Sequence, residues 1–135
     1  MLDRIDLQIE VPAVSAADLV LPQAAEGSAE MRARVTAARA AQMARFTALG
    51  QRRVRTNAEC DGALLEEIAA PKPDGLKLLR EAADALSLSA RGYHRTLRVA
   101  RTLADLDGEE SVARIHIAEA LSYRGETLRR AQAAA

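Results

Sequence analysis

The chain has 135 residues and a mass of 14.5 kDa, about the size of one domain. Its 19 Lys and Arg balance 19 Asp and Glu, so no net charge draws it as a whole to nucleic acid or to an anionic membrane. One cysteine, Cys60, excludes an intramolecular disulfide and a zinc site built from cysteines. No apolar run approaches the roughly 20 residues of a membrane span, and charges near the start argue against a signal peptide, so we expect a cytoplasmic protein without a membrane partner.

The first segment has the alternating pattern of a strand. Ile5, Leu7, Ile9 and Val11 alternate with polar residues, and Pro12 ends the run. A lone strand cannot satisfy its hydrogen bonds, and the chain encodes no further strand to pair with it. We therefore expect residues 1–27 to be a flexible strand and connector severed from the core of a larger protein.

Helical periodicity dominates the rest of the chain, and the sparse aromatic content and abundant Ala favour close-packed helices over a β-sandwich. The sequence predicts an all-α fold, a small bundle of about four to five helices over residues 28–127, and a disordered tail over 128–135. The first helix is expected from a Ser28 cap to about Leu49, with Gly50 as its stop. Its expected apolar stripe is Met31, Val35, Ala38, Gln42, Phe46 and Leu49.

Four shorter helical segments follow. A helix with Leu64, Leu65 and Ile68, capped by Asn57 or Asp61, is expected to end at the breaker sequence of residues 71–75. Further helices are expected over 76–86, from a Ser89 cap to just before Gly108, and over 114–124. The expected apolar face of the last is Ile115, Ala118, Leu121 and Ser122.

Charge is unevenly distributed along the chain. Residues 29–55 carry seven Arg and one acidic residue, whereas residues 56–89 carry three basic and seven acidic residues. The basic segment could contact DNA or an acidic protein. The alternative, which we favour, is a solvated face or an inter-subunit rim that matches the acidic block of another copy. The candidate contact residues are Arg32, Arg39, Arg45, Arg52 and Arg53.

Motifs for nucleotide hydrolysis or covalent catalysis are absent. The sequence has no phosphate-binding Gly-x-x-x-x-Gly-Lys-[Ser/Thr] loop and no dinucleotide, zinc-protease or nucleophile-elbow motif. His94 and His116 lack an acidic cluster at metal-ligand spacing, so a packing or surface role is favoured for both and no metal site is expected. Cys60 is similarly expected to be a small apolar residue. Arg4 and Arg91 would suit a phosphate of a neighbouring module, but from the residues alone an ordinary surface ion pair is favoured for each.

Three segments carry a resemblance to a known family. Residues 2–12 (LDRIDLQIEVP) resemble the end of the AAA+ core in magnesium-chelatase-like ATPases of the ComM competence-protein type. Residues 88–106 (LSARGYHRTLRVARTLADL) resemble the C-terminal lid signature of that family, and residues 117–124 (IAEALSYR) resemble its closing helix. With the helix from Ser28 to Gln42, the resemblance extends over nearly the whole chain and is weakest around Arg55–Glu59 and Pro71–Gly75.

The resemblance implies roles for two arginines. Arg4 falls on the arginine finger of the Leu-x-Arg-[Ile/Phe]-Asp motif, and Arg91 falls on the second-sensor arginine of the lid. In the family, the long helix repositions the lid so that both arginines would serve the ATP of an adjacent subunit. Such donors stabilise the charge that develops during phosphoryl transfer.

The resemblance also implies what the chain lacks and whom it meets. The nucleotide-binding motifs of the family lie upstream, so the isolated chain is expected to bind no cofactor and not to be an enzyme, whereas a full-length parent would use ATP and Mg²⁺. Its partners would be the upstream core, neighbouring subunits of a homo-oligomeric ring, a hexamer by family analogy, and DNA as the substrate of a branch-migration or helicase motor in recombination. The alternatives are a free-standing helical binding module and, less favoured, a subunit of magnesium chelatase itself.

Overall fold

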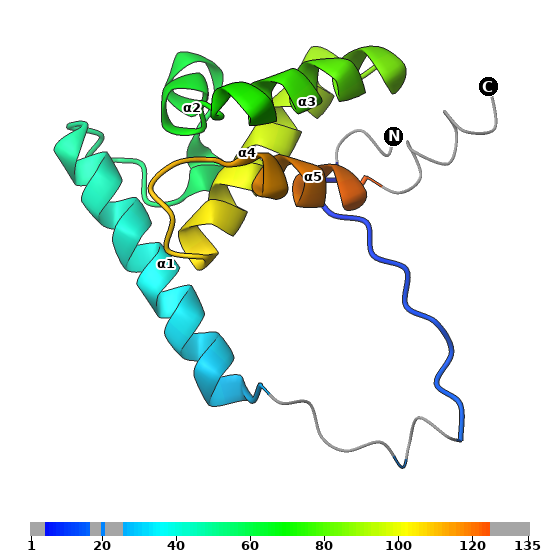
Figure 1. Cartoon of the computed structure of the whole chain (residues 1–135). Coiled ribbons are helices and arrows are strands. Elements are labelled where there is room, and N and C mark those ends of the chain that lie inside the picture. Colours follow the sequence, from blue (N-terminus) through cyan, green and yellow to red (C-terminus); the bar gives the residue numbers. More distant parts are fainter. Residues whose placement is uncertain (1–4, 17–19, 21–25, 125–135) are drawn as a thin grey trace.

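The computed structural model describes residues 5–16, 20 and 26–124, and this part of the chain contains five α-helices and no sheet (Figure 1). The predicted all-α bundle is thereby confirmed, while Arg4 and the tail over residues 128–135 lie outside the described residues. The elements in chain order are α1 (Ser28–Ala48), the 3₁₀ turn η3 (Asn57–Glu59), α2 (Gly62–Ile68), α3 (Pro73–Ala85), α4 (Ala90–Leu106) and α5 (Arg114–Ser122).

Helix α4 is the centre of the bundle. It packs against α1, α2, η3 and α5, and α5 also packs against α3 (Figure 1). Its Leu97, Ala100 and Ala104 are buried, and the small alanine side chains let neighbouring helices approach closely. The other large apolar side chains of the core are Phe46, Leu65, Ile68, Leu79, Val112, Ile117 and Leu121.

The helix ends are explained by local chemistry. Gly50 and Gly108 follow α1 and α4 with φ of 69° and 73°, a left-handed conformation that glycine adopts without the steric cost of a side chain. Ser89 caps α4 as predicted, since its hydroxyl accepts a 3.1 Å hydrogen bond from the Gly92 N–H. Helix α3 begins at Pro73, three residues before the predicted start, because the fixed φ of proline suits the first helical turn.

The N-cap of α1 differs from the prediction. Gly27, not Ser28, occupies that position, and Ser28 is the first helical residue. The Glu30 carboxylate accepts a 3.0 Å hydrogen bond from the Gly27 N–H and satisfies a donor that the helix leaves free.

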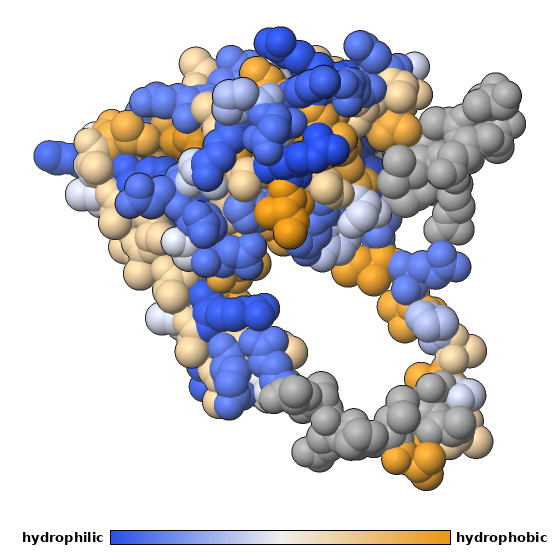
Figure 2. Space-filling model, viewed as in Figure 1, coloured by the Kyte–Doolittle hydropathy of each residue, from blue (hydrophilic) through white to orange (hydrophobic). Residues whose placement is uncertain are grey.

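Helix α1 projects beyond the bundle at its N-terminal half (Figure 1). Its buried residues are Ala38, Gln42 and Phe46, all in the C-terminal half. Met31 and Val35, which the apolar stripe predicted to be inside, are each 50% exposed. Figure 2 shows strongly hydrophilic side chains along this projecting half.

The predicted strand is not formed. Residues 5–11 are extended, but in the described part of the chain they take part in one isolated parallel bridge, between Gln8 and Arg124. Ile9 and Val11 are 69% and 83% exposed. Alternation alone does not make a strand where no neighbouring strand accepts its hydrogen bonds.

The predicted apolar face of α5 is wrong in part. Ile115 and Ala118 are exposed, whereas His116, Ile117, Ala120 and Leu121 are buried. Helix α5 is buried against both α3 and α4, and the histidine enters the interior because both its ring nitrogens find partners there.

Candidate functional site: a basic face at the start of α4

The N-terminal half of α4 presents four basic side chains on one face. Arg91, His94, Arg95 and Arg98 follow one another at steps of three, one and three residues, so all four lie on about one side of the helix. They line a depression of about 370 Å³ together with Asp61 and Ala90. The positive end of the helix dipole adds to their charge, and this end of α4 therefore favours an anion.

Three of the four basic side chains already have protein partners. Arg95 Nη1 lies 2.7 Å from Asp6 Oδ1. Arg98 Nη2 donates a 2.5 Å hydrogen bond to the Cys60 carbonyl oxygen, and His94 Nε2 lies 3.3 Å from a carboxylate oxygen of Glu66 on α2.

Arg91 differs from its neighbours on this face. It is exposed, and it has no hydrogen-bond or ion-pair partner among the described residues. A guanidinium placed in this way keeps all five donors for a ligand.

The structure thus places Arg91 with three residues that sequence reasoning did not assign to the site. His94, Arg95 and Arg98 were recognisable from their spacing relative to Arg91, which puts them on the same helix face. Their partners were not recognisable, because Asp6, Cys60 and Glu66 come from distant parts of the sequence. Arg4 lies outside the described residues.

The five candidate contact residues of the 29–55 segment do not line this depression. Arg32 and Arg39 are exposed on α1, and Arg52 and Arg53 are exposed in the loop that follows it. Arg45, expected to face away from the bundle, instead turns inward and forms an ion pair with the buried Asp105. Arg45 is therefore not available to an external partner, whereas the other four arginines are exposed.

Asp105 organises a buried polar cluster between α1, η3 and α4. Its carboxylate binds Arg45 and Arg101 and accepts hydrogen bonds from Gln42 at 3.1 Å and Asn57 at 2.8 Å. Burial alone would raise the pKa of Asp105, but the hydrogen bonds from Arg45 and Asn57 and the charge of Arg101 outweigh it and lower the pKa below its ordinary value. Burial lowers the pKa of Arg101 despite the attraction of Asp105. This cluster anchors α1 and does not open onto the basic face.

His116 and Cys60 are buried in environments typical of packing residues. His116 is buried, its Nδ1 accepts a 3.0 Å hydrogen bond from the Ala113 N–H, and its Nε2 lies 3.1 Å from Asp107 Oδ2. Cys60 is also buried, and burial raises the pKa of its thiol, which disfavours the nucleophilic thiolate. Both environments agree with the packing roles favoured from the sequence.

The described residues form neither a metal-binding cluster nor a membrane-spanning helix. Over residues 5–16, 20 and 26–124, no three His, Cys, Asp or Glu side chains are grouped so that they would hold a metal ion. No helix in the same ranges is long and apolar enough to cross a membrane.

Comparison with known proteins defines the class. Residues 25–124 match the family model described as magnesium chelatase, subunit ChlI C-terminal, and this range includes all five helices and the basic face of α4. The chain therefore belongs to the magnesium-chelatase C-terminal domain family, and the resemblance seen in its sequence is confirmed.

Individual curated proteins are similar to the chain over most of its length. The competence protein ComM of Haemophilus influenzae is 38% identical over 131 residues, which cover 91% of this chain and 23% of that protein. An uncharacterized protein of Mycobacterium tuberculosis strain H37Rv is 41% identical over 135 residues, covering 96% of this chain and 25% of that protein. The uncharacterized protein YifB of Escherichia coli is 35% identical over 126 residues, covering 91% and 23%. The chain thus spans about a quarter of the length of these curated relatives.

Proposed function

We propose that the chain is the lid and inter-subunit domain of a ComM-like AAA+ ATPase, and that Arg91 is its second-sensor arginine. The observation that carries this proposal is the state of Arg91. It is an exposed guanidinium without a partner in the described part of the chain, at the start of α4, beside a depression lined by two further arginines. The family membership and the match to ComM support the same role.

The chemistry of this face suits the phosphates of ATP. Negative charge spreads over the γ-phosphate oxygens as phosphoryl transfer proceeds, and a fixed cation that contacts those oxygens lowers the barrier. Arg91 would bind the phosphate, while Arg95 and Arg98, held by Asp6 and the Cys60 carbonyl, would keep the local potential positive. Arg4 would act as the arginine finger, and we propose that both arginines serve the ATP of an adjacent subunit.

ATP and Mg²⁺ would be cofactors of the full-length protein. ATP supplies the transferable phosphoryl group, and the residues at the start of α4 fit its phosphates because they are cationic. Those residues do not fit a metal ion, since Asp61 is the one carboxylate that lines the depression. We therefore assign the ligands of Mg²⁺ and the contacts to the adenine base of ATP to an upstream core. We expect no ATP hydrolysis by the chain alone.

We further propose that the parent is a homo-oligomeric motor, a hexamer by family analogy, that acts on DNA in the cytoplasm during natural transformation and recombination. The name of the Haemophilus relative, competence protein, supports this direction over magnesium insertion into a porphyrin. The upstream core and the neighbouring subunits would be the direct partners of this domain, and DNA would be a partner of the whole assembly.

The deciding experiment removes the guanidinium of Arg91 in the full-length protein. Arg91→Ala should leave ATP binding within about threefold of the wild type and lower kcat by about three orders of magnitude, because the missing cation acts mainly in the transition state. Arg80→Ala, which removes an exposed arginine of α3, is the matched control and should turn over normally. Steady-state ATPase assays and nucleotide-binding titrations measure the two effects.

A complementation assay tests whether the arginine acts in trans. Arg91→Ala subunits mixed with subunits unable to bind ATP should recover part of the turnover, since each intact arginine then faces an intact ATP site. Normal turnover of Arg91→Ala alone would contradict the proposed role, and a loss of turnover without recovery on mixing would contradict its action across a subunit boundary.

A further inference from the structure

The extended segment before α1 is attached to the basic face of α4 by a specific ion pair. Asp6 Oδ1 lies 2.7 Å from Nη1 of Arg95, one turn along α4 from Arg91. A backbone bond fixes the same segment nearby, because the Gln8 N–H donates to the Tyr123 carbonyl oxygen at 2.8 Å. Between described residues, the segment thus has an attachment to α4 and another at the end of α5.

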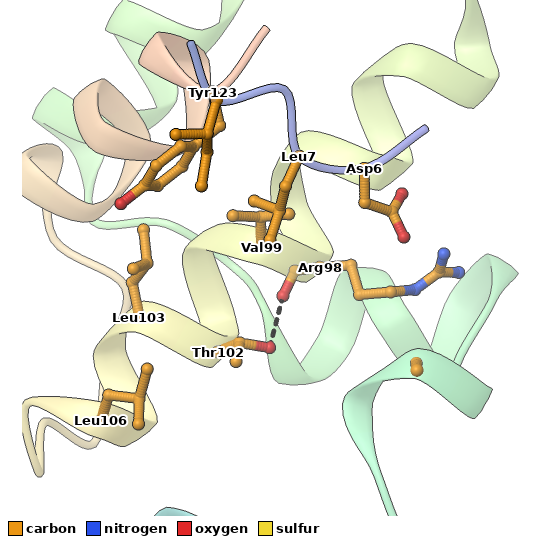
Figure 3. A pocket seen from close by; sticks show the side chains of 10 residues that line it. Asp6, Leu7, Arg98, Val99, Thr102, Leu103, Leu106 and Tyr123 are labelled. Atoms are coloured by element: carbon orange, nitrogen blue, oxygen red, sulfur yellow. Dashed lines mark hydrogen bonds between the residues drawn. The ribbon is translucent and has the colours of Figure 1, made fainter. Parts of the chain in front are cut away.

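Apolar contact adds little to this attachment. Leu7 and Ile9 lie over a groove of about 350 Å³ whose other walls include Val99, Leu103 and Tyr123 (Figure 3). Leu7 nevertheless remains 49% exposed and Ile9 69% exposed. Since these side chains are only partly covered, the polar contacts help to determine the register of the segment on the helix.

Arg95, the partner of Asp6, lies close to the proposed ATP-contacting residue Arg91. The side chain of Asp6 points toward the basic side of α4, where Arg98 also lines the groove (Figure 3). Asp6 follows Arg4 by two residues in the sequence, and Arg95 follows Arg91 by four residues on the same helix face. The Asp6–Arg95 pair thus joins the segment that carries one proposed ATP-contacting arginine to the helix that carries the other.

We infer that Asp6 is a positioning residue, which through Arg95 fixes the extended segment before α1 on the helix that carries Arg91, and so sets how that helix is placed when Arg91 meets the ATP. This inference rests on the proposed function. The bundle does not need the pair in order to fold, because no residue of the 5–16 segment belongs to the buried core. The pair acts instead on placement, to which rates are sensitive, since a displacement of about 1 Å can cost about a hundredfold in rate.

The test compares conservative variants in the full-length ATPase. Asp6→Asn should lower kcat about tenfold and leave the KM for ATP within about twofold, because positioning and not binding is lost. Asp6→Glu keeps the carboxylate and should restore kcat to within about threefold of the wild type. Glu81→Gln, which removes a carboxylate from the exposed Lys77–Glu81 pair on α3, is the matched control and should have no effect.

A double-mutant cycle shows whether the effect passes through Arg95. Arg95→Gln should lower kcat at least as much as Asp6→Asn does, because it also removes a positive charge from the basic face. The double variant should be no slower than Arg95→Gln alone. Losses that multiply would overturn the inference, as would normal kcat in Asp6→Asn or an equal loss in Asp6→Glu.

A measurement on the 135-residue chain separates this inference from the proposed function. The Gln8 amide should exchange its hydrogen about threefold faster in Asp6→Asn than in the wild type, because the segment then opens more often. Unchanged exchange would overturn the coupling whatever the ATPase assays give. Normal turnover in Arg91→Ala would instead defeat the proposed function while leaving this attachment measurable.

Discussion

At the scale of single residues, arginine side chains have different roles that depend on their partners. Arg45 and Arg101 are held by a buried carboxylate, Arg95 by a partly exposed one, and Arg91 by no described residue. A guanidinium is always charged, so its partners decide whether it stabilises the fold, orients a segment or remains available to a ligand.

Asp105 stabilises the fold by pairing with buried cations. Asp105→Asn removes the negative charge from a site where Arg101 is 1% exposed, and it should lower the free energy of unfolding at pH 7 by about 3–5 kcal/mol because a buried cation loses its counterion. Asp84→Asn, an exposed change on α3, should cost about 0.5 kcal/mol or less. Urea unfolding of the two variants measures the difference, and equal stability would contradict a buried charge cluster.

The pH dependence of stability gives the same carboxylate a second test. The pKa of folded Asp105 lies below the ordinary value of 3.8, so the unfolded chain takes up a proton on this group more readily than the folded chain. Its contribution is therefore fully present above about pH 4 and is lost as the pH falls through the lower folded-state pKa. Thermal unfolding of the wild type should lose stability more steeply below pH 4 than that of Asp105→Asn, and parallel curves would contradict this.

At the scale of elements, α1 consists of two halves with different support. The C-terminal half is fixed by Phe46, which is 1% exposed, and by the Asp105 cluster. The N-terminal half buries no side chain. An isolated helix of about ten residues is only marginally stable in water. This half is therefore available to contact another surface.

The difference between the two halves predicts unequal mutational costs. Phe46→Ala should destabilise the chain by about 3–5 kcal/mol, since it leaves a cavity in the core. Val35→Ala should cost about 0.5 kcal/mol or less, because Val35 is half exposed. Denaturant unfolding compares the two, and a cost for Val35→Ala equal to that for Phe46→Ala would place the whole of α1 in the core.

The helices were predictable because local chemistry determines their ends. Gly50 and Gly108 stop α1 and α4, and Ser89 caps α4, for reasons that operate within a few residues. The predictions failed where distant residues decide. Ile115 and Ala118 were expected in the core but are exposed, and Ile117 and Ala120 are buried instead, because α3 and α4 surround α5 and decide which of its faces is covered.

The candidate site shows the same division. Arg91 was identified from a family motif, and its neighbours Arg95 and Arg98 follow from helical spacing. The inward turn of Arg45 was not predictable, because its partner Asp105 is 60 residues away in sequence. Pattern reveals the face on which a charge lies, whereas its availability depends on tertiary partners.

At the scale of the whole molecule, the net charge of zero is the sum of a basic and an acidic segment. The exposed arginines of α1 and its following loop are basic, whereas the segment from residue 56 to residue 89 is acidic. Copies in a ring would bring such surfaces together, which favours the inter-subunit interpretation of the basic segment over direct DNA binding.

This interpretation predicts weak binding of DNA by the chain alone. Its affinity for a short duplex at physiological salt should lie in the non-specific range, a Kd of roughly 10⁻⁴ to 10⁻⁶ M, and should fall steeply with added salt because binding releases counterions. Replacing Arg32, Arg39, Arg52 and Arg53 by Gln should weaken it further and flatten the salt dependence, whereas Arg45→Gln should act mainly on stability, since Arg45 is paired with Asp105. Fluorescence anisotropy over a salt series measures both effects. A sub-micromolar Kd would favour the free-standing DNA-binding module, because a domain specialised for contact with neighbouring subunits has no reason to hold DNA so tightly.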